Sequence, residues 1–379
     1  MSEPLLAARN VAARAWRRAA AVPKRMVRLT RRTRRLRQQA AIFQGEWRVE
    51  RELAALARGR GPIIAGPWLS EVGFEVLYWI PFLAWFEDRY RVDRERVVAV
   101  SRGGVADWYS GVADRYVEIF DHVEPAAFTV RNAARRAEHE AGGQKQTRLS
   151  GFDEELIAIA RDAAGDSRAT VCHPSLMYRL FNQFWLGNRA ADVVFRRTSY
   201  GALGGDATTA TITVAPRPDL RLPERFIAAK FYTGAALPDT PACRAGLRDL
   251  VRLAAAEMPV VMLDTGLGTD EHDDYLFTDI PNVFSLRDRL EPRTNLGVQT
   301  AVVAASQRFI GTCGSLAWLA PMLGVPTVGV YADERLLTTH LYLARQVFRH
   351  MNAAPFDTLD LGAALELDLL APVAQESGR

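Results

Sequence analysis

The chain has 379 residues, of which 49% are hydrophobic, and its formal net charge at pH 7 is +4. This length and composition suffice for a large core, which excludes global disorder and favours two domains of ordinary size. Three cysteines without a CxxC pair or a His/Cys cluster argue against a disulfide framework and a structural zinc site, and fit a reducing compartment.

The N-terminal segment carries most of the positive charge. Residues 1–40 contain twelve Arg or Lys and a single acid, Glu3, so the remainder of the chain is mildly acidic. Arginines surround a helical stripe of apolar residues, Val22, Met26, Leu29, Leu36 and Phe43. Two interpretations stay open, a helix over residues 1–45 on an anionic membrane surface and a solvated arm. No nucleic-acid motif accompanies the charge, so we expect no nucleic-acid partner.

From residue 61 short apolar runs alternate with amphipathic stretches, the pattern of strands and helices around a parallel sheet. The residues from 173 to 205 lack clear periodicity and receive no assignment. In chain order the predicted elements of this half are a strand at 62–66, a loop at 67–73, a long helix from Phe74 to Tyr90, a strand at 96–101, a helix at 107–120, a surface loop at 131–150 and a helix at 152–164.

A second and clearer βα series begins near Ala207. It predicts an open, doubly wound sheet whose ligand site lies at the carboxyl ends of the strands. The predicted strands are 226–232, 259–266, 282–286, 308–312 and 326–332, and the predicted helices are 241–257, 293–306 and 315–324. The expected fold is therefore two Rossmann-like α/β domains facing across a cleft. The expected divisions are a basic helical leader at 1–58, an N-terminal α/β domain at 59–205, a C-terminal α/β domain at 206–355 and a tail or helix at 356–379.

The segment from 309 to 332 is a strand that ends in a Gly/Thr/Ser turn and opens directly onto a helix. Such a turn offers the unpaired amides of a first helical turn to an anion, and a diphosphate is the natural guest. The donor-binding residues predicted here are Gly311, Thr312, Gly314, Ser315 and Leu316. The alternative is purely structural, with Ser315 capping the helix and the glycines forming a tight turn.

This segment resembles the late donor-binding motif of GT-B glycosyltransferases, especially bacterial heptosyltransferases and some fucosyltransferases. In heptosyltransferases the strand ends in an Asp-Thr-Gly turn, and a histidine follows in the next helix. Here the turn is Thr312-Cys313-Gly314, and Trp318 stands near the histidine position. The resemblance covers roughly residues 226 to 332 in the order of elements. It implies a GT-B fold and a nucleotide-sugar donor.

Polar residues follow the other strands of the second series. Lys230 draws attention because the chain uses lysine only at 24, 145 and 230, and an ammonium beside a phosphate seat would stabilise it. Its alternative is a strand-end lysine with its amine in solvent. Asp264 could accept a sugar hydroxyl or be an ordinary turn aspartate. Together the predicted donor-side residues are Lys230, Tyr232, Asp264, Thr265 and Asn295.

The loop after the first strand is the predicted acceptor side. By the same resemblance, an acidic residue near here deprotonates the acceptor hydroxyl, and Glu71 is the only acid within the loop. Glu75, one turn later, competes with it, and Glu71 could instead be a helix N-terminal carboxylate stabilised by the dipole. The remaining residues predicted for this side are Gly66, Trp68, Ser70 and Gly73.

These residues lead us to expect a glycosyltransferase that moves a sugar from a nucleotide-sugar donor to an acceptor hydroxyl without a metal or cofactor. The expected acceptor is a glycan or a lipid-linked molecule, as in cell-envelope polysaccharide or glycolipid synthesis. We expect a cytoplasmic protein, since no run of about 20 apolar residues is present, either free or peripheral at the membrane's inner face. The alternatives are a nucleotide-sugar epimerase of similar fold and a non-catalytic scaffold at a membrane surface.

Overall fold

The computed structural model describes residues 33, 36–138, 145–201, 217–267, 272–335 and 337–366. The chain divides into two compact units, Met1–Glu52 and Leu53–Arg379, so the first unit ends before the boundary predicted at residue 58. In the first unit residues 36–52 are helical. Most of the predicted leader stripe, including Val22, Met26 and Leu29, lies outside the described residues. Across the described ranges, no helix combines the length and the apolar character that crossing a bilayer requires.

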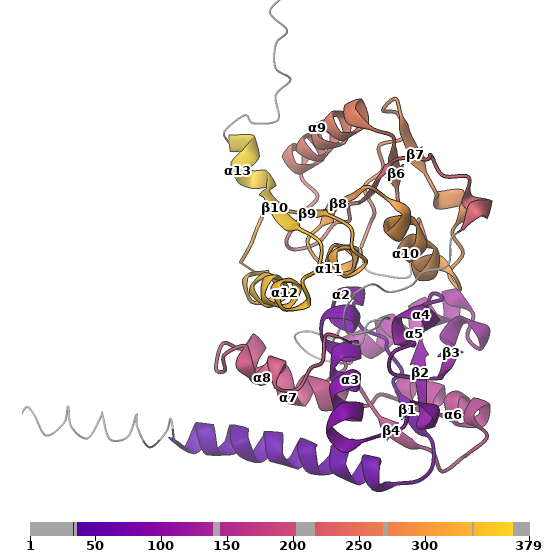
Figure 1. The fold of residues 1–379 in the computed structure, drawn as a ribbon, viewed down its shortest axis with the longest axis vertical. Helices are drawn as coiled ribbons and strands as arrows, with labels where there is room; N and C mark the ends of the chain where they lie inside the picture. Colours follow the sequence, from indigo (N-terminus) through magenta and orange to yellow (C-terminus); the bar gives the residue numbers. More distant parts are fainter. Residues whose placement is uncertain are drawn as a thin grey trace, which may run out of the picture. The chain divides into compact units, whose positions relative to one another are not determined.

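The second unit contains two sheets, both fully parallel (Figure 1). The first has the spatial order β3-β2-β1-β4, so the strand order reverses between β1 and β4. We call the part of the chain around this sheet the N-terminal lobe. Its strands are β1 (Ile63–Ala65), β2 (Val97–Ser101), β3 (Arg115–Glu118) and β4 (Thr170–Cys172).

The second sheet, in the C-terminal lobe, has the spatial order β10-β9-β8-β5-β6-β7. This is the doubly wound order of dinucleotide-binding folds, and it reverses between β5 and β8. A ligand crevice is expected at that reversal, outside the carboxyl ends of the strands. The strands are β5 (Ile227–Lys230), β6 (Val260–Met262), β7 (Val283–Ser285), β8 (Arg308–Thr312), β9 (Thr327–Tyr331) and β10 (Phe356–Asp360).

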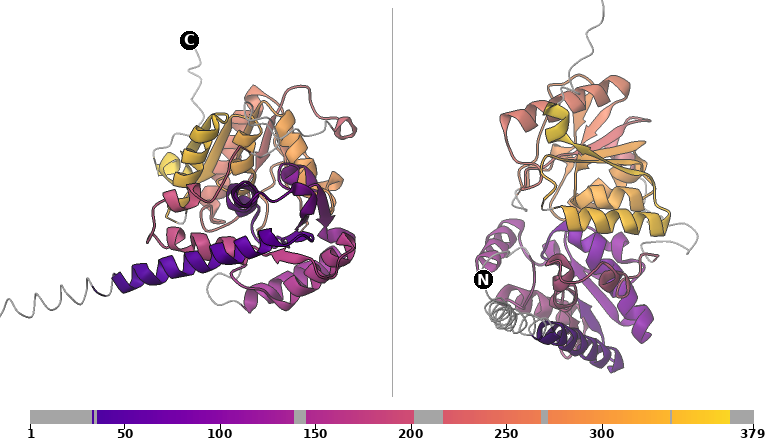
Figure 2. Two further views of the ribbon diagram at one scale, coloured as in Figure 1. Left: turned by 60° about the horizontal axis from the view of Figure 1, so that its bottom comes forward. Right: turned by 90° about the vertical axis from the view of Figure 1, so that its left-hand side faces the viewer.

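Helices flank both sheets, as two views from other sides show (Figure 2). In the N-terminal lobe these are α2 (Val72–Phe74), the π-helical segment Glu75–Trp79, α3 (Ile80–Tyr90), α4 (Ala106–Tyr109), α5 (Pro125–Ala137), α6 (Gly151–Ala164), α7 (Ser175–Trp185) and α8 (Asp192–Phe195). In the C-terminal lobe they are α9 (Pro241–Glu257), α10 (Asn295–Ala305), α11 (Ser315–Met322), α12 (Thr338–Met351) and α13 (Leu361–Glu366). Short 3-10 turns occur at Arg94–Arg96, Ile119–Asp121, Pro218–Leu220 and Arg287–Arg289.

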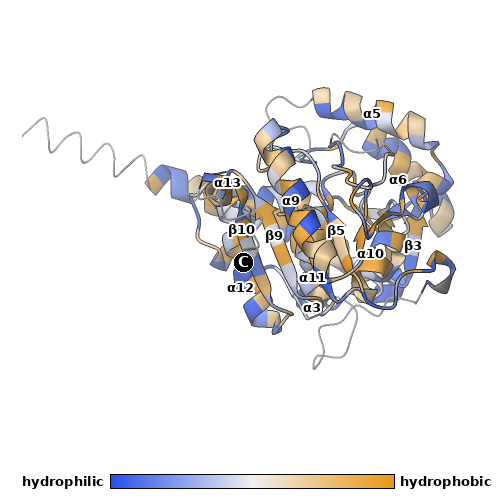
Figure 3. Cartoon of the chain, turned by 90° about the horizontal axis from the view of Figure 1, so that it is seen from above, coloured by the Kyte–Doolittle hydropathy of each residue, from blue (hydrophilic) through white to orange (hydrophobic). Residues whose placement is uncertain are grey.

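Each lobe has its own apolar core between strands and helices. In the N-terminal lobe Ile64 and Val98 pack with Phe128 of α5, and in the C-terminal lobe Ile227 and Val260 pack with helix α9. Figure 3 shows the apolar strands β5 and β9 under helices of mixed polarity such as α9. Burial of the apolar helix faces against buried parallel strands explains the alternating pattern of the sequence.

The predicted fold of two Rossmann-like domains is confirmed, and every strand and helix expected between residues 226 and 332 is present. Some of the elements predicted for the N-terminal lobe were wrong. The helix predicted at 107–120 is the short α4 followed by β3, because the alternating residues 115–118 pair with β2. Helix α5 covers the first part of the loop predicted at 131–150.

The unassigned stretch of the N-terminal lobe contains α7 and α8, and strand β4 directly precedes it. The predicted tail at 356–379 was wrong for its first five residues, because Phe356–Asp360 forms β10 and pairs with β9. The predicted boundary between residues 205 and 206 falls in 202–216, outside the described residues.

Candidate functional site

A cavity of about 460 Å³ lies at the carboxyl ends of strands from both lobes. Its wall includes residues after β1 and β2 on one side and residues after β5 and β8 on the other. Both sheets therefore direct their strand ends to one space, at the position where parallel α/β sheets bind ligands. A volume of this size is in the range of small-molecule sites.

The loop that follows β1 is held by side chains from other elements. The Gln146 amide accepts from the Leu69 backbone N–H at 2.8 Å and donates to the Pro67 carbonyl at 2.8 Å. Gln146 is fully buried and also donates to Asp153 at 2.9 Å. A buried amide that satisfies two backbone groups fixes the path of the loop.

A second anchor comes from the end of β2. The Arg102 guanidinium donates to the carbonyls of Trp68 and Ser70, at 3.2 and 3.0 Å. The Ser70 hydroxyl lies 2.8 Å from the Tyr178 hydroxyl on α7. The predicted acceptor loop is thus rigid immediately before Glu71.

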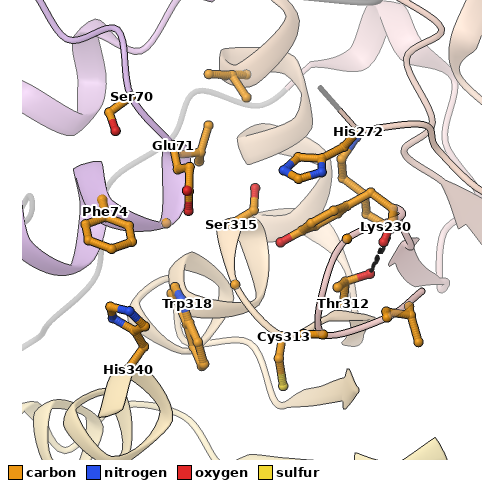
Figure 4. A pocket seen from close by; sticks show the side chains of 18 of the residues that line it. Ser70, Glu71, Phe74, Lys230, His272, Thr312, Cys313, Ser315, Trp318 and His340 are labelled. Carbon is orange, nitrogen blue, oxygen red and sulfur yellow. Dashed lines mark hydrogen bonds between the residues drawn. The ribbon is translucent and has the colours of Figure 1, made fainter. Parts of the chain in front are cut away.

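Glu71 is the residue before α2, and it lines the cavity. In Figure 4 the side chains of Glu71 and Ser315 point into the same space from the two lobes. Gly73 comes so close to α11 that a Cβ atom there would lie 2.8 Å from the Ser315 amide nitrogen. A glycine at this position therefore permits the close approach of α2 to the start of α11.

Glu75, the competing candidate, does not line the cavity. It is fully buried in the π-helical segment, where its carboxylate accepts from Ser101 Oγ and Tyr109 OH, each at 2.6 Å. Burial raises the pKa of Glu75 to about 7, against the opposing effect of the nearby Arg102 charge. Buried against Ser101 and Tyr109 and absent from the cavity wall, Glu75 has a structural environment.

Two further residues of the predicted acceptor loop also lie away from the cavity wall. Trp68 is fully buried and stacks on Trp79 and Tyr178, with ring centroids 5.8 and 6.3 Å away. Gly66 packs against β2, since a Cβ atom there would lie 2.6 Å from the Val100 carbonyl oxygen. The prediction of these two as cleft residues was wrong because the chain enters the cavity only from Leu69 onward.

The turn after β8 contributes Thr312, Gly314 and Ser315 to the cavity wall. Gly314 has φ 123°, a backbone conformation that favours glycine, and a Cβ atom there would lie 2.7 Å from the Tyr232 hydroxyl. Ser315, with φ 41°, begins α11, and the Ala317 amide in its first turn donates to the Gly314 carbonyl at 2.8 Å. The Thr312 hydroxyl is used internally, because it accepts from the Tyr232 N–H at 2.9 Å.

Lys230 lines the cavity but is an ion-paired lysine. Its ammonium donates to the Leu263 carbonyl at 2.9 Å and lies 3.2 Å from Asp274. Asp274 also accepts from the Thr265 N–H at 2.7 Å. The Asp274 carboxylate offsets part of the Lys230 charge, and the role of Lys230 beside a phosphate stays a prediction.

Some of the other residues predicted on the donor side line the cavity, and the rest lie outside its wall. Thr265 and Asn295 line the cavity. Asp264 does not, because it is buried and accepts from Ser285 Oγ and Arg287 Nε, both at 2.8 Å. Gly311 and Leu316 also lie outside the wall: the glycine allows β8 to approach the Lys230 carbonyl, and the leucine side chain is buried in the core.

Several cavity residues were not among the predicted site residues. The cationic ones are Arg102, which follows β2 directly, Arg136 on α5 and Lys145. The C-terminal lobe adds His340, whose pKa burial lowers to about 4 and whose Nδ1 lies 2.7 Å from Tyr78 OH. The rarity of lysine in the sequence was the available signal for Lys145. The sequence contains no such signal for Arg102, Arg136 and His340, because their places in the wall depend on contacts between distant segments. The additional lining residues include Asn132, His272, Asp274, Gln299 and Trp318.

No protein-family model and no curated protein matches the chain. Among solved structures it is similar to a family 9 glycosyl transferase from Veillonella parvula, with 13% identity, a TM-score of 0.41 and coverage of 83% of this chain and 91% of that one. It is also similar to E. coli ADP-heptose LPS heptosyltransferase II, with 13% identity, a TM-score of 0.41 and coverage of 82% and 98%. A third is the UDP-GlcNAc 2-epimerase of Methanocaldococcus jannaschii, with 7% identity, a TM-score of 0.32 and coverage of 84% and 93%.

Proposed function

We propose that the chain is a glycosyltransferase that moves a sugar from a nucleotide-sugar donor to an acceptor hydroxyl. One observation carries this proposal. The carboxylate of Glu71 and the Gly314–Ser315 turn at the start of α11 face the same cavity from two doubly wound lobes. One side provides a base, and the other provides amides suited to a diphosphate.

In this reaction Glu71 accepts the proton of the acceptor hydroxyl while the acceptor oxygen bonds to the anomeric carbon. The bond from that carbon to the donor diphosphate breaks, and the diphosphate leaves with the electron pair. The amides at the start of α11 stabilise the negative charge of the leaving group. The anchored loop holds Glu71 in place throughout, which reduces the reorganisation that the transfer requires.

The finer features of the proposal concern acceptor and location. A basic segment suits an enzyme that acts on lipid-linked acceptors at an anionic surface. We propose a cytoplasmic, metal-independent enzyme of cell-envelope polysaccharide or glycolipid synthesis. These features are separable from glycosyl transfer itself.

A donor screen tests the function. Purified full-length protein is incubated with UDP-, GDP- and ADP-sugars and a bacterial glycolipid extract, and released nucleoside diphosphate is measured with and without EDTA. Acceptor-dependent release that survives EDTA is the expected result. Conversion of a nucleotide sugar without acceptor would instead identify an epimerase. Absence of both turnover and nucleotide-dependent thermal stabilisation would contradict the proposal.

A further inference from the structure

His340 comes from the C-terminal lobe and contacts the N-terminal lobe in the wall of the cavity. It lies in the first turn of α12 and lines the cavity together with Tyr78. Its Nδ1 is 2.7 Å from the Tyr78 hydroxyl oxygen. Its ring packs edge-on against Phe74, with ring centroids 4.9 Å apart, and Figure 4 shows these two rings next to each other. A hydrogen bond and an aromatic contact therefore hold the imidazole in place.

The hydrogen bond with Tyr78 determines which nitrogen of the His340 ring carries the proton. Burial lowers the pKa of His340 to about 4, and the charge of Lys145 acts in the same direction, so the imidazole is neutral at neutral pH and has one N–H. Tyr78 is fully buried, and among the described residues its hydroxyl has no acceptor other than His340 Nδ1. Because a buried hydroxyl proton needs an acceptor, Tyr78 donates to Nδ1, and the ring proton is on Nε2.

The Nε2–H group of His340 is available to a ligand. No group in the described part of the chain is hydrogen bonded to Nε2, and this nitrogen is not one of the described polar atoms that are both buried and without a partner. An unpaired polar atom that is not buried is accessible, and the space that this ring lines is the cavity. His340 therefore offers a neutral hydrogen-bond donor to the cavity.

The wall around His340 is next to the turn that starts α11. A Cβ atom on Gly73 would lie 2.8 Å from the Ser315 amide nitrogen and 3.0 Å from Cδ1 of Trp318. Phe74 follows Gly73 directly, and both aromatic residues line the cavity. In a nucleotide sugar the sugar is bonded to the diphosphate, so a diphosphate at the start of α11 puts the sugar beside this wall. A neutral N–H among aromatic rings suits a sugar hydroxyl, which has no charge to be compensated.

We infer that His340 determines specificity for the donor sugar, because its Nε2–H donates a hydrogen bond to a hydroxyl oxygen of that sugar. Tyr78 is the positioning residue that keeps the ring proton on Nε2. This inference rests on the proposed function and names the group that recognises the sugar part of the donor. Both lobes contribute to the contact, since Tyr78 belongs to the N-terminal lobe and His340 to the C-terminal lobe.

Two conservative replacements of His340 separate contact with the sugar from a structural role. In His340→Gln the side-chain amide reaches the position of Nε2, so a donor to the ligand is kept and the bond with Tyr78 is lost. In His340→Asn the amide reaches only the position of Nδ1, so the contact with Tyr78 is kept and the donor to the ligand is lost. His350→Gln is the matched control, because His350 lies on the same helix and is exposed. Circular dichroism and thermal melting check that each full-length variant folds.

Isothermal titration calorimetry compares binding of UDP-glucose, GDP-mannose and ADP-glucose with binding of UDP, GDP and ADP. We expect His340→Asn to bind the nucleotide sugar about 3- to 10-fold more weakly than the wild type, the loss of one neutral hydrogen bond. Its affinity for the nucleoside diphosphate should not change. His340→Gln should keep most of the affinity for the nucleotide sugar, and His350→Gln all of it.

The position of the ring proton is measured without any ligand. Nitrogen NMR of protein labelled at its histidines distinguishes a ring nitrogen that carries hydrogen from one that does not, and the signals of His340 are those missing from His340→Gln. We expect the hydrogen on Nε2 in the wild type and a mixture of both tautomers in Tyr78→Phe. A wild-type protein with the hydrogen on Nδ1 would overturn the inference.

Two binding results would also overturn it and leave glycosyl transfer standing. One is a folded His340→Asn variant that binds the nucleotide sugar as the wild type does. The other is a His340→Asn variant that loses affinity equally for the nucleotide sugar and for the nucleoside diphosphate, since the contact would then be with phosphate. A wild-type protein that binds neither class of ligand would contradict the proposed function and, with it, the role of His340.

Discussion

The two turns that face each other across the cavity are built in different ways. The loop after β1 is held by side chains from distant segments, such as Gln146 and Arg102. The turn after β8 is shaped by its own backbone, with Gly314 at φ 123° and Ser315 at φ 41° directly before and at the start of α11. The first arrangement positions a side chain, Glu71, and the second presents main-chain amides.

The two constructions suit different chemical tasks. A general base must be held at a fixed place relative to one hydroxyl, which a loop anchored at several backbone groups achieves. An anion site needs several amides and space, which a glycine turn at a helix start is suited to provide. Substitutions in or beside one turn, with the other turn left unchanged, test these two roles separately.

The largest expected effect is on the base. Glu71→Gln should lower kcat about 10²- to 10⁴-fold, because the amide cannot accept the hydroxyl proton. Glu75→Gln should change kcat less than about tenfold, since Glu75 is buried outside the cavity. Steady-state release of nucleoside diphosphate measures both. Equal losses in the two variants, or a larger loss for Glu75→Gln, would show that the base is assigned to the wrong carboxylate.

Next in size is the ion pair beside the α11 turn. Lys230→Met should lower the free energy of unfolding by about 3 kcal/mol, because it leaves the largely buried carboxylate of Asp274 without its cation. The double variant Lys230→Met/Asp274→Asn should recover part of that loss. Urea unfolding of the four proteins in this cycle gives the coupling energy. A Lys230→Met variant of unchanged stability that no longer binds nucleotide would contradict the structural role and support the phosphate role predicted from the sequence.

A smaller effect is expected from the loop anchor. Gln146→Leu removes both hydrogen bonds to the loop, at Leu69 N–H and the Pro67 carbonyl, and should cost about 2 kcal/mol of unfolding free energy. It should also lower kcat more than it raises KM, because Glu71 loses its fixed position. Gln183→Leu on α7 is the matched control, because among the described residues its side chain bonds only to Asn188, and it should stay within about 0.5 kcal/mol of wild type.

The sequence predicted one of these two turns much better than the other. The strand, glycine turn and helix from Phe309 to Met322 follow from local residue types, and the structure has all three. The side chains that anchor the β1 loop lie far away in sequence: Gln146 is 77 residues from Leu69, and Tyr178 is 108 from Ser70. No local pattern encodes such pairings, because they exist only once the lobe has folded.

The same reasoning explains the errors within the predicted site. The strand-end rule placed Lys230 at the cavity correctly, but its neutralising partner Asp274 is 44 residues further along the chain. Asp264 also follows a strand, yet it turns toward Ser285 and Arg287 instead of the cavity. Position after a strand predicts the edge of the sheet, whereas the direction and charge balance of a side chain depend on tertiary neighbours.

The smallest expected effect is on the pH dependence of the free energy of unfolding, and it comes from the buried Glu75. Its pKa is about 7 in the folded protein, and burial is the main cause, compared with an ordinary value of 4.5. Between these values the folded state holds a proton that the unfolded state has released. Stability from this group is therefore complete below pH 4.5 and falls as the pH rises toward 7, by at most roughly 1.4 kcal/mol per pH unit.

Glu75→Gln removes this titration while the other ionisable groups stay the same in both proteins. The difference in unfolding free energy, variant minus wild type, should therefore increase between pH 4.5 and 7 and become constant above that range. Urea unfolding at closely spaced pH values measures it. A difference that is flat across this range would mean that Glu75 ionises as easily in the folded protein as in the unfolded chain. The Glu75 carboxylate would then be solvated. Its surroundings would be more open to water than its hydrogen bonds with Ser101 and Tyr109 indicate.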